Sequence, residues 1–278
     1  MKPEIGNPAI RVDREIVCRA FREAGAVAGD TVLFHGSLSS MGTVVAGPVT
    51  VFDGILDATG PGGTVAMPTL WYNGTPDRRN PAAFDPLRSP AYNGALAEGL
   101  RTDPRSVRSH HFSHAVSAIG ARAGELTVSH GTTGLAPAPW SDRAFADDSP
   151  WHRLYLWNAL YAFIGVDLSV CTMKHYIESR LVMRLLSLLP PEARDAKRGE
   201  LDRDCTPRCW PYFPSGQLEA RLIELGLEQQ TRLGSATLRA IRTRPLVEVL
   251  GQVLWDEPER WLNADFLKWR AEILARAT

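Results

Sequence analysis

The feature that most constrains the fold is a strand, a helix and a second strand that follow one another near the start of the chain. TVLFHG at 31–36 is short and apolar, with β-branched residues at its start, as buried strands are. GPVTVFDGILDATG follows as a predicted helix, with Pro48 near its first turn and Gly60 past its end. GTVAMPT at 63–69 predicts another buried strand. Such crossovers are right-handed and make strands parallel, so we expect an α/β fold with a mostly parallel sheet flanked by helices.

The rest of the chain extends this pattern and ends in sequence with helical periodicity. ALYAFIGV at 159–166 predicts a further buried strand, which leads into a helix around CTMKHYIESR. From about residue 215 onward, stretches such as SATLRAIRTRPLVEVLGQVL indicate a helical C-terminal portion. With 278 residues, of which 44% are hydrophobic and 22% are charged, we expect a single globular domain over 1–278.

Charge and composition argue against several classes of protein. The chain has 31 basic and 31 acidic residues, so there is no electrostatic case for nucleic acid or an anionic membrane as partner. It has no apolar run long enough to span a bilayer, and MKPEIGNPAIRVDRE lacks the apolar core of a signal peptide. Four scattered cysteines are too few for a disulfide framework, so a cytoplasmic location is expected.

Two loops leave predicted strand ends, which is where α/β sheets bind ligands. HGSLSSMG at 35–42 places glycines and hydroxyl residues between a strand and a helix, so its backbone N–H groups could hold an anion. A plain flexible turn is the alternative. The loop lacks the Gly-Lys-Ser/Thr ending of nucleotide triphosphatases and the G-x-G-x-x-G pattern of dinucleotide sites. The second loop, 70–92, is rich in Pro, Asn and Asp and is long enough to suggest a functional or disordered segment.

Thr172, His175 and Glu178 recur three residues apart and would line one row of a helix. A glutamate beside an imidazole fixes its tautomer and raises its basicity, and a nearby hydroxyl can stabilise a developing oxyanion. The alternative is a structural histidine beside a surface glutamate. Cys171, four residues before His175, raises a rival in which a thiolate attacks and forms a covalent acyl intermediate.

A histidine cluster offers a different chemistry. RSVRSHHFSH brings together His110, His111 and His114 with Arg105 and Arg108. Three histidines in five residues could hold the metal of a hydrolase. No Asp or Glu lies in this stretch, so we expect no metal, and the arginines fit better as phosphate contacts.

Taken in order, these motifs resemble the aminoglycoside 3-N-acetyltransferase family, antibiotic acetyltransferases that are unrelated to the larger GNAT superfamily. The resemblance runs from about Ile16 to Leu262. LFHGSLSSMGTVVAGPVTVFDGILDATGPGGTVAMPT resembles the family's opening strand, Ser-Leu-Ser loop, helix and second strand. FDPLRSPAYNGALAEGLRTDPRSVRSHHFSHAVSAIG resembles its central segment, and DDSPWHRL, FIGVDLSVCTMKHYIE and GSATLRAIRTRPLVEVL follow.

The resemblance implies direct acetyl transfer from acetyl-CoA to a primary amine of an aminoglycoside or similar antibiotic, without a metal, by a monomer or homodimer. It implies that His175 is the general base, Glu178 its orienting partner and Thr172 a stabiliser of the oxyanion. The implied coenzyme A contacts are His35, Gly36, Ser37, Leu38, Ser39, Ser40, Met41, Gly42, Thr69, Arg108, Ser109 and Ser113. The expected acceptor contacts are Trp71, Tyr72, Asp77 and Asp142. A binding protein that keeps the fold without turnover is a non-enzymatic rival.

The sequence departs from the family pattern at three positions. Phe112 stands where a proline is expected, Ala115 where serine is common, and Lys174 where the element is normally apolar. A polycationic aminoglycoside also calls for carboxylates, whereas this chain is neutral. A non-aminoglycoside amine, such as an aminophosphonate or another natural-product intermediate, is therefore the alternative acceptor. Candidate acidic contacts beyond Asp77 are Asp142, Asp147, Asp148, Asp202 and Asp204.

Overall fold

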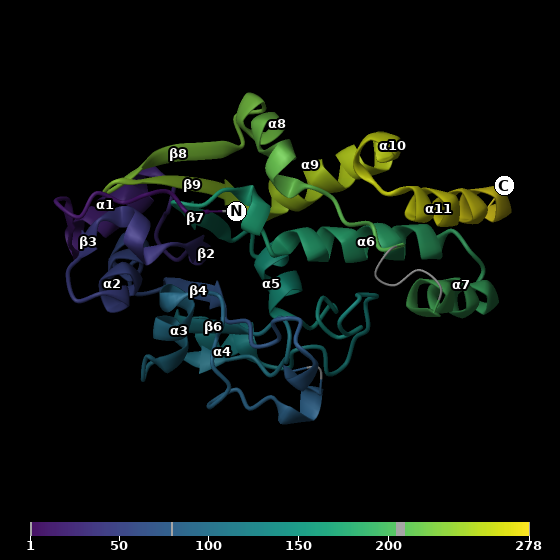
Figure 1. Ribbon diagram of the computed structural model, residues 1–278, viewed down its shortest axis with the longest axis horizontal. Helices are drawn as coiled ribbons and strands as arrows, with labels where there is room; N and C mark the ends of the chain where they lie inside the picture. Colours follow the sequence, from purple (N-terminus) through teal and green to yellow (C-terminus); the bar gives the residue numbers. More distant parts are fainter. Residues whose placement is uncertain (1, 79, 204–208, 278) are drawn as a thin grey trace.

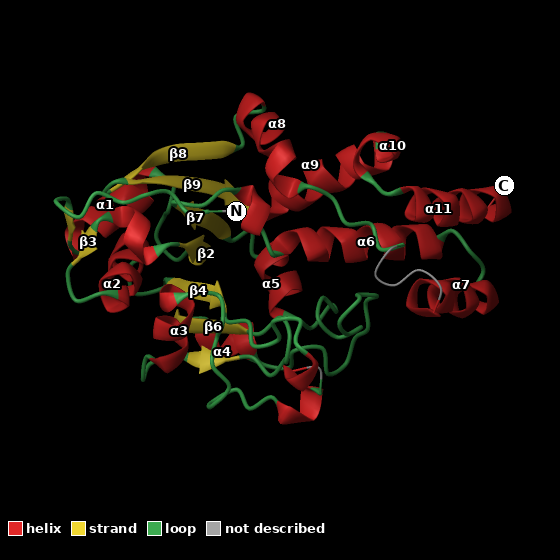
Figure 2. Cartoon of the chain, in the orientation of Figure 1, coloured by secondary structure: helices red, strands yellow, loops and turns green. Residues whose placement is uncertain are grey.

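The computed structural model describes residues 2–78, 80–203 and 209–277. A seven-stranded sheet lies at the centre of its main body, with helices packed against it (Figures 1 and 2). The strands run in the order β5 (Val107–Arg108), β6 (Val116–Gly120), β4 (Thr64–Pro68), β2 (Thr31–Gly36), β7 (Leu160–Ile164), β9 (Ala236–Arg242) and β8 (Glu228–Leu233). The α/β class is therefore confirmed.

The sheet is mixed, and only its centre is parallel. β2 pairs in parallel with β4 on one side and β7 on the other, as the crossover predicts. β6 and β5 extend one edge by antiparallel pairing, and β9 and β8 extend the other edge in the same way. The expectation of a mostly parallel sheet was wrong for both edges, because the outer strands come as antiparallel pairs, with a short loop joining β5 to β6 and a tight turn joining β8 to β9.

The predicted crossover is present with its expected ends. Helix α2 (Pro48–Thr59) begins with proline in its first turn and ends at Gly60, whose φ is +70°. Helix α1 (Arg14–Glu23) begins at Asp13, whose side chain accepts a hydrogen bond from the Ile16 amide. Residues of β2 are buried on both faces, which explains why this strand reads as a continuous apolar run.

One C-terminal prediction was wrong. Residues 236–242 were expected to be helical, but they form β9, paired with β7 and with β8. Gly234, with a φ of +60°, and Ser235 make the tight turn between β8 and β9. A Gly-Ser pair between two short runs is a hairpin signal, and here it outweighs the helical spacing of the following leucines and isoleucine. The C-terminal portion therefore has helices on both sides of the β8–β9 hairpin, at Glu219–Glu224 before it and from Thr243 onward after it.

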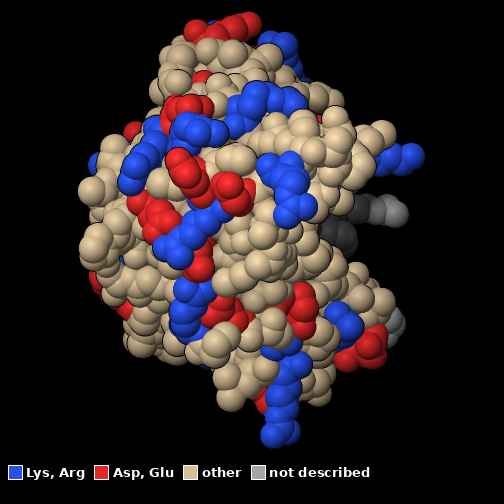
Figure 3. Space-filling model, turned by 90° about the vertical axis from the view of Figure 1, so that its left-hand side faces the viewer, with Lys and Arg blue, Asp and Glu red and all other residues tan. Residues whose placement is uncertain are grey.

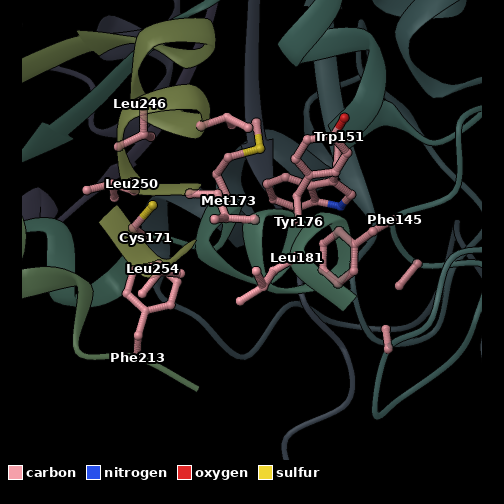
Figure 4. Packing of buried hydrophobic residues seen from close by; sticks show 14 of the residues in the cluster. Phe145, Trp151, Cys171, Met173, Tyr176, Leu181, Phe213, Leu246, Leu250 and Leu254 are labelled. Atoms are coloured by element: carbon pink, nitrogen blue, oxygen red, sulfur yellow. The ribbon is translucent and has the colours of Figure 1, made fainter. Parts of the chain in front are cut away.

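Two hydrophobic cores cover the two faces of the sheet, because successive strand residues point to opposite sides. Val32 and Phe34 contribute to the core beneath α1 and α2, whereas Leu33 contributes to the other core. That second core continues into the packing of α6 (Met173–Ser187) and α9 (Thr243–Asp256), part of which Figure 4 shows. The remaining α-helices are α3 (Ala95–Thr102), α4 (Ala123–Thr127), α5 (Pro150–Leu156), α7 (Pro191–Arg203), α8 (Glu219–Glu224), α10 (Pro258–Trp261) and α11 (Ala264–Ala277).

Short elements complete the fold. β1 (Arg11–Val12) and β3 (Thr43–Val44) form a separate two-stranded sheet. Single 3-10 turns lie at η1 (Leu38–Met41), η2 (Pro76–Arg78), η3 (Pro81–Ala83), η4 (Leu168–Val170) and η5 (Ser215–Leu218). On the face shown in Figure 3, acidic and basic side chains are interspersed, in keeping with the zero net charge. Within the described residues, no helix combines the length and apolar character needed to cross a membrane.

Candidate functional site

A cavity of about 660 Å³ opens where β2 ends, and we call it the strand-end cavity. The loop after β2 supplies one side of it, and the first residues after β4 and β7 supply others, as expected for a parallel sheet centre. Its wall includes six residues that the sequence assigned to coenzyme A, namely His35, Gly36, Ser37, Leu38, Ser39 and Gly42. The structure therefore brings this part of the predicted set together around one opening.

Hydrogen bonds on the side away from the cavity hold the loop at 37–42 in place. The Ser40 hydroxyl donates to the Ser37 carbonyl at 2.7 Å, and the Ser235 hydroxyl donates to the Ser40 carbonyl at 2.8 Å. Gly165 has a φ of +63°, and a Cβ there would lie 2.0 Å from Ser40 Oγ, so glycine is required for this close approach. Ser40 and Met41 are fully buried and lie outside the cavity wall. Their side chains hold the loop in place.

The N-terminal arm closes another side of the strand-end cavity. Pro3 belongs to the cavity wall. The amide of Glu4 donates to the Gly165 carbonyl at 2.9 Å, and its carboxylate accepts from the Thr237 amide at 2.8 Å. The guanidinium of Arg239 also lies 3.2 Å from this carboxylate. The cavity therefore depends on residues far apart in the sequence as well as on the predicted loop.

Four predicted coenzyme A contacts lie elsewhere. Thr69 is buried, with its hydroxyl 2.9 Å from that of Ser117. Arg108 donates to the carbonyls of Ser89, at 2.6 Å, and Thr69, and burial lowers the pKa of this guanidinium to about 10. Both terminal nitrogens of Arg108 thus bind the protein's own backbone, and the residue lies outside the lining of the strand-end cavity.

Ser109 and Ser113 also differ from expectation. The Ser109 hydroxyl accepts from the Val116 amide at 2.9 Å and lies 2.8 Å from His130 Nδ1 in the fully buried interior. Ser113 lines the pocket beside His175 instead, and its hydroxyl lies 2.8 Å from His114 Nδ1. The sequence grouped these residues because they are neighbours in the chain, but the turn between β5 and β6 separates them.

The first turns of α6 bring the predicted polar row together. His175 Nδ1 lies 2.8 Å from Glu178 Oε2, and the indole N–H of Trp210 donates to the same oxygen at 2.8 Å. Glu178 is fully buried, whereas the His175 side chain is 16% exposed. Because Nδ1 is held by the carboxyl group, Nε2 is the ring nitrogen left for a ligand.

Burial makes any isolated charge on this pair costly. It lowers the pKa of His175 well below its ordinary value, and the nearby charge of Lys174 lowers it further. Burial also raises the pKa of Glu178 to about 8, although the Trp210 hydrogen bond opposes this. The imidazole is therefore neutral at pH 7, as a proton acceptor must be.

Thr172 is positioned by a second histidine. Its hydroxyl lies 3.2 Å from His35 Nε2 at the end of β2, and its backbone amide donates a hydrogen bond to the Tyr161 hydroxyl at 3.0 Å. Burial lowers the pKa of His35 to about 3, so this ring stays neutral. Thr172 and Leu70 line both the strand-end cavity and a smaller pocket at His175. The two hollows thus meet at Thr172.

This smaller hollow, which we call the His175 pocket, has a volume of about 300 Å³, and half of its lining residues carry aromatic rings. The Trp140 ring lies 4.6 Å from the His175 ring, and Tyr212 lies 6.0 Å from it. Its lining consists of Leu70, Tyr72, Asn73, Gly74, Tyr92, Ser113, His114, Trp140, Thr172 and His175. Among the described residues, no carboxylate belongs to this lining.

Only one of the four expected acceptor contacts lines the His175 pocket, and it is Tyr72. Trp71 is buried against Phe84, with ring centroids 5.8 Å apart. Asp77 is exposed on the surface, and Asp142 forms an ion pair with Arg198. Asp77 and Asp142 therefore lie outside the pocket. The loops at 70–92 and 129–149 turn aromatic residues toward His175 in place of these carboxylates.

The other acidic candidates are also engaged or outside the described structure. Asp147 pairs with Arg180 at 2.8 Å, and Asp148 accepts from the amides of Thr132 and Thr133. Asp204 lies outside the described residues, as does the side chain of Asp202.

Trp140, Trp210 and Tyr212 were not predicted as site residues, and His114 was considered only as a metal ligand. The proline-containing stretches GLAPAPW and CWPYFP were the available signals, since buried aromatic residues within such loops commonly build pockets.

The rival sites are not assembled. Cys171 is 1% exposed, and burial raises the pKa of its thiol to about 12, so it is not a thiolate at neutral pH. His111 and His114 have ring centroids 6.2 Å apart, and His111 Nδ1 accepts from backbone amides. In the described ranges, no three His, Cys, Asp or Glu side chains are grouped as metal ligands. The histidine cluster thus lacks the geometry of a metal-dependent hydrolase.

Comparison with known proteins identifies the relatives. A family model described as aminoglycoside 3-N-acetyltransferase matches residues 33–254. The chain is 33% identical over 183 residues to aminoglycoside N(3)-acetyltransferase VII of Streptomyces paromomycinus, a match covering 60% of each protein. It is 34% identical over 184 residues to enzyme VIII of Streptomyces fradiae, covering 61% of each. The chain thus matches about three fifths of the length of these curated relatives.

Solved structures share the fold over most of the chain. Aminoglycoside acetyltransferase AAC(3)-Xa superimposes with a TM-score of 0.66 at 27% identity, covering 88% of this chain and 93% of the other. The binary complex of AAC-IIIb with CoASH gives a TM-score of 0.68 at 21% identity, covering 91% and 98%. The fold is that of these acetyltransferases and not of the GNAT superfamily. The chain therefore belongs to the aminoglycoside 3-N-acetyltransferase family.

Proposed function

We propose that the protein is an N-acetyltransferase that transfers the acetyl group of acetyl-CoA to a primary amine of an aminoglycoside or a similar antibiotic. The observation that carries this proposal is the junction of two hollows at Thr172, with the His175–Glu178 pair beside it. One hollow is large enough for the arm of a coenzyme, and the other presents a neutral imidazole.

The strand-end cavity is the proposed site of acetyl-CoA. Gly36 and Gly94 lie in its wall, and Gly36 is closely packed, since a Cβ there would lie 3.0 Å from the Ile164 side chain. The apolar lining from Leu38, Val44 and Val170 suits a pantetheine chain, and the hydroxyls of Ser37 and Ser39 suit its polar groups. The structural relative AAC-IIIb was solved with CoASH. When bound, acetyl-CoA supplies the thioester whose acyl carbon the amine attacks.

His175 and Thr172 supply the proposed catalysis. His175 Nε2 takes the proton of the attacking amine, directly or through one water molecule, and later returns a proton to the leaving thiolate. Glu178, held by Trp210, accepts the hydrogen bond of Nδ1–H and so keeps the ring oriented while it carries that proton. The Thr172 hydroxyl donates to the acetyl oxygen as negative charge develops on it. A positioned base of this kind accelerates such a step about 100- to 10,000-fold.

Two classes of acceptor are consistent with the site. The named relatives act on aminoglycosides, and aromatic walls can pack against sugar rings or attract an ammonium group. A second candidate is a less cationic, non-aminoglycoside amine such as an aminophosphonate. Its support is that the described lining of the His175 pocket has no carboxylate, while the charge of Lys174 acts on His175.

A thiol-release assay tests both the proposed acetyl transfer and the class of the acceptor. Purified protein is mixed with acetyl-CoA and a panel of aminoglycosides, zwitterionic amines and aminophosphonates, and free thiol is measured. Amine-dependent release that survives a chelator is expected, because no step uses a metal. If no amine on the panel releases thiol while ligands still raise the melting temperature, the protein is a binding protein and the proposed turnover is wrong.

A further inference from the structure

A third cavity, of about 600 Å³, shares Trp140 with the His175 pocket, and the proposed reaction does not use it. We call it the His111 cavity. The segment just before β6 and the loop at 127–143 form its walls. Trp140 and Phe112 provide two aromatic surfaces, and most of the remaining lining is polar.

The hydrogen bonds around His111 fix which of its nitrogens carries the proton. Nδ1 accepts from the backbone amides of Ser113, at 3.3 Å, and His114, at 3.1 Å. An imidazole nitrogen that accepts hydrogen bonds carries no proton, so the proton of this neutral ring is on Nε2. His111 is only 5% exposed, it lines the cavity, and Nε2 is buried without a protein partner among the described residues. A buried N–H donor of this kind favours a ligand that can accept its hydrogen bond.

The ring of His111 is also held in place. It stacks on His130 with centroids 4.6 Å apart. His130 is itself fixed, because its Nε2 lies 3.0 Å from the Ala144 carbonyl and its Nδ1 lies 2.8 Å from Ser109 Oγ. Both nitrogens of His130 are therefore used internally. The cavity thus presents one buried donor in a fixed position and not a pair of histidine metal ligands.

Arg143 adds a positive charge to the same cavity. Its side chain is exposed, and within the described part of the chain no carboxylate lies at ion-pair distance from its guanidinium. The polar lining contains no described carboxylate, and it also includes His110, Thr127, Ser129, His130, Thr132 and Ser141. Two strong donors and two aromatic faces suit a ligand with an acceptor-only group at one end and a planar body at the other.

We infer that the His111 cavity binds an organic anion whose carboxylate or phosphate accepts hydrogen bonds from His111 Nε2 and the Arg143 guanidinium, while its ring packs against Trp140 and Phe112. This site is distinct from the strand-end cavity and does not depend on acetyl transfer. Because Trp140 also contacts the His175 ring, an occupant of this cavity would contact a wall of the catalytic pocket.

Four probes with one ring and different head groups test the inference: benzoate, phenyl phosphate, benzyl alcohol and benzyltrimethylammonium. Binding is followed through the indole N–H resonance of Trp140, assigned with Trp140→Phe. Benzoate and phenyl phosphate should saturate this signal with Kd values on the order of 1 mM, a reasonable strength for ligands of this size. The alcohol and the cation should bind at least about tenfold more weakly. Equal binding of all four probes, or of none, would overturn the inference.

Three variants locate the anion. Arg143→Ala should weaken benzoate about tenfold, because it removes the charged donor. His111→Asn should weaken it similarly, since Asn can still accept from the two amides but lacks Nε2–H; an unchanged melting temperature shows that the fold is kept. Lys174→Ala is the matched control, because that cation acts on His175. If Lys174→Ala weakens benzoate and Arg143→Ala does not, the anion binds in the His175 pocket and the inference is wrong.

Discussion

The strand-end cavity and the His175 pocket meet at Thr172, but the chain builds them in different ways. The largest single contribution to the first comes from the end of β2 and the loop after it, and residues at or after the ends of β4 and β7 also contribute. The second comes from segments that are far apart in the sequence, at 70–74, Tyr92, 113–114 and Trp140, together with α6. The strand-end cavity is built around the ends of the central strands, whereas the His175 pocket is built mainly from loops.

This difference separates the two tasks of the proposed enzyme. A cavity fixed by buried parallel strands tolerates little change, which suits a co-substrate that stays the same. Loops on a rigid scaffold can change without disturbing the fold, which suits an acceptor that varies between relatives. We therefore expect substitutions in the two hollows to have separable effects on the two substrates.

The largest effect is expected from a substitution that removes the proposed catalytic base and leaves the strand-end cavity intact. His175→Ala should lower kcat about 100- to 10,000-fold, because the amine loses its proton acceptor. Calorimetry should show unchanged affinity for coenzyme A. His110→Ala is the control, since His110 is exposed and lies outside the His175 pocket. Near-normal turnover by His175→Ala would remove the general-base role.

Substitution of Thr172, where the two hollows meet, should lower kcat and change substrate binding only slightly. Thr172→Val keeps the shape of the side chain but removes the hydroxyl that faces His35. If this hydroxyl donates to the oxyanion, kcat should fall about 100-fold while both KM values change little. A rise in the KM for acetyl-CoA with unchanged kcat would instead show that Thr172 only binds the donor.

Two neighbouring valines can test the strand-end cavity alone. Val44 lines the cavity, whereas the next residue, Val45, is 38% exposed and does not. Val44→Tyr should raise the KM for acetyl-CoA about tenfold by filling part of the cavity, with the acceptor KM unchanged. Val45→Tyr should leave both constants near their normal values. Equal effects of the two substitutions would show that the coenzyme does not enter here.

The smallest expected effect concerns stability and pH. Burial raises the pKa of Glu178 from 4.5 to about 8, so the folded protein binds this proton more tightly than the unfolded chain does. The resulting contribution to the free energy of unfolding is complete below pH 4.5 and is lost as the pH rises through 8. The stability of the wild type relative to Glu178→Gln should therefore fall across this range, by a few kcal/mol at most. Denaturant unfolding at several pH values measures the difference.

Glu228 offers a comparison outside the site. Burial raises its pKa to about 7, so Glu228→Gln should show the same sign over a window that ends about one pH unit lower. A Glu178 difference that grows with pH would contradict the raised pKa.

The sequence predicted the parts of the molecule that depend on local signals. The strand, loop and helix from Thr31 to Gly60 were predictable because apolar runs, Pro48 and the glycines fix them within a short span. The spacing of Thr172, His175 and Glu178 was readable because a helix imposes its own geometry. These features need no knowledge of distant contacts.

The parts that were missed depend on contacts across the fold. β9 has helical spacing but becomes a strand because the edge of β7 is available for pairing. Trp210 reaches Glu178 from 32 residues away, and no local pattern encodes that hydrogen bond. Arg108 has the chemistry of a phosphate ligand, but its partners, the carbonyls of Thr69 and Ser89, are set by how the long loop folds over β5.

The N-terminal arm has a practical consequence for anyone handling this protein. Pro3 lies in the wall of the strand-end cavity, and Glu4 is hydrogen-bonded to β9 and to Gly165, so a purification tag added at this end would emerge beside that cavity. Helix α11 ends at the right of Figure 1, well away from β2 and from the N-terminal end of the chain. Immobilisation through the carboxyl end should therefore preserve affinity, whereas anchoring through the amino end should obstruct the ligand.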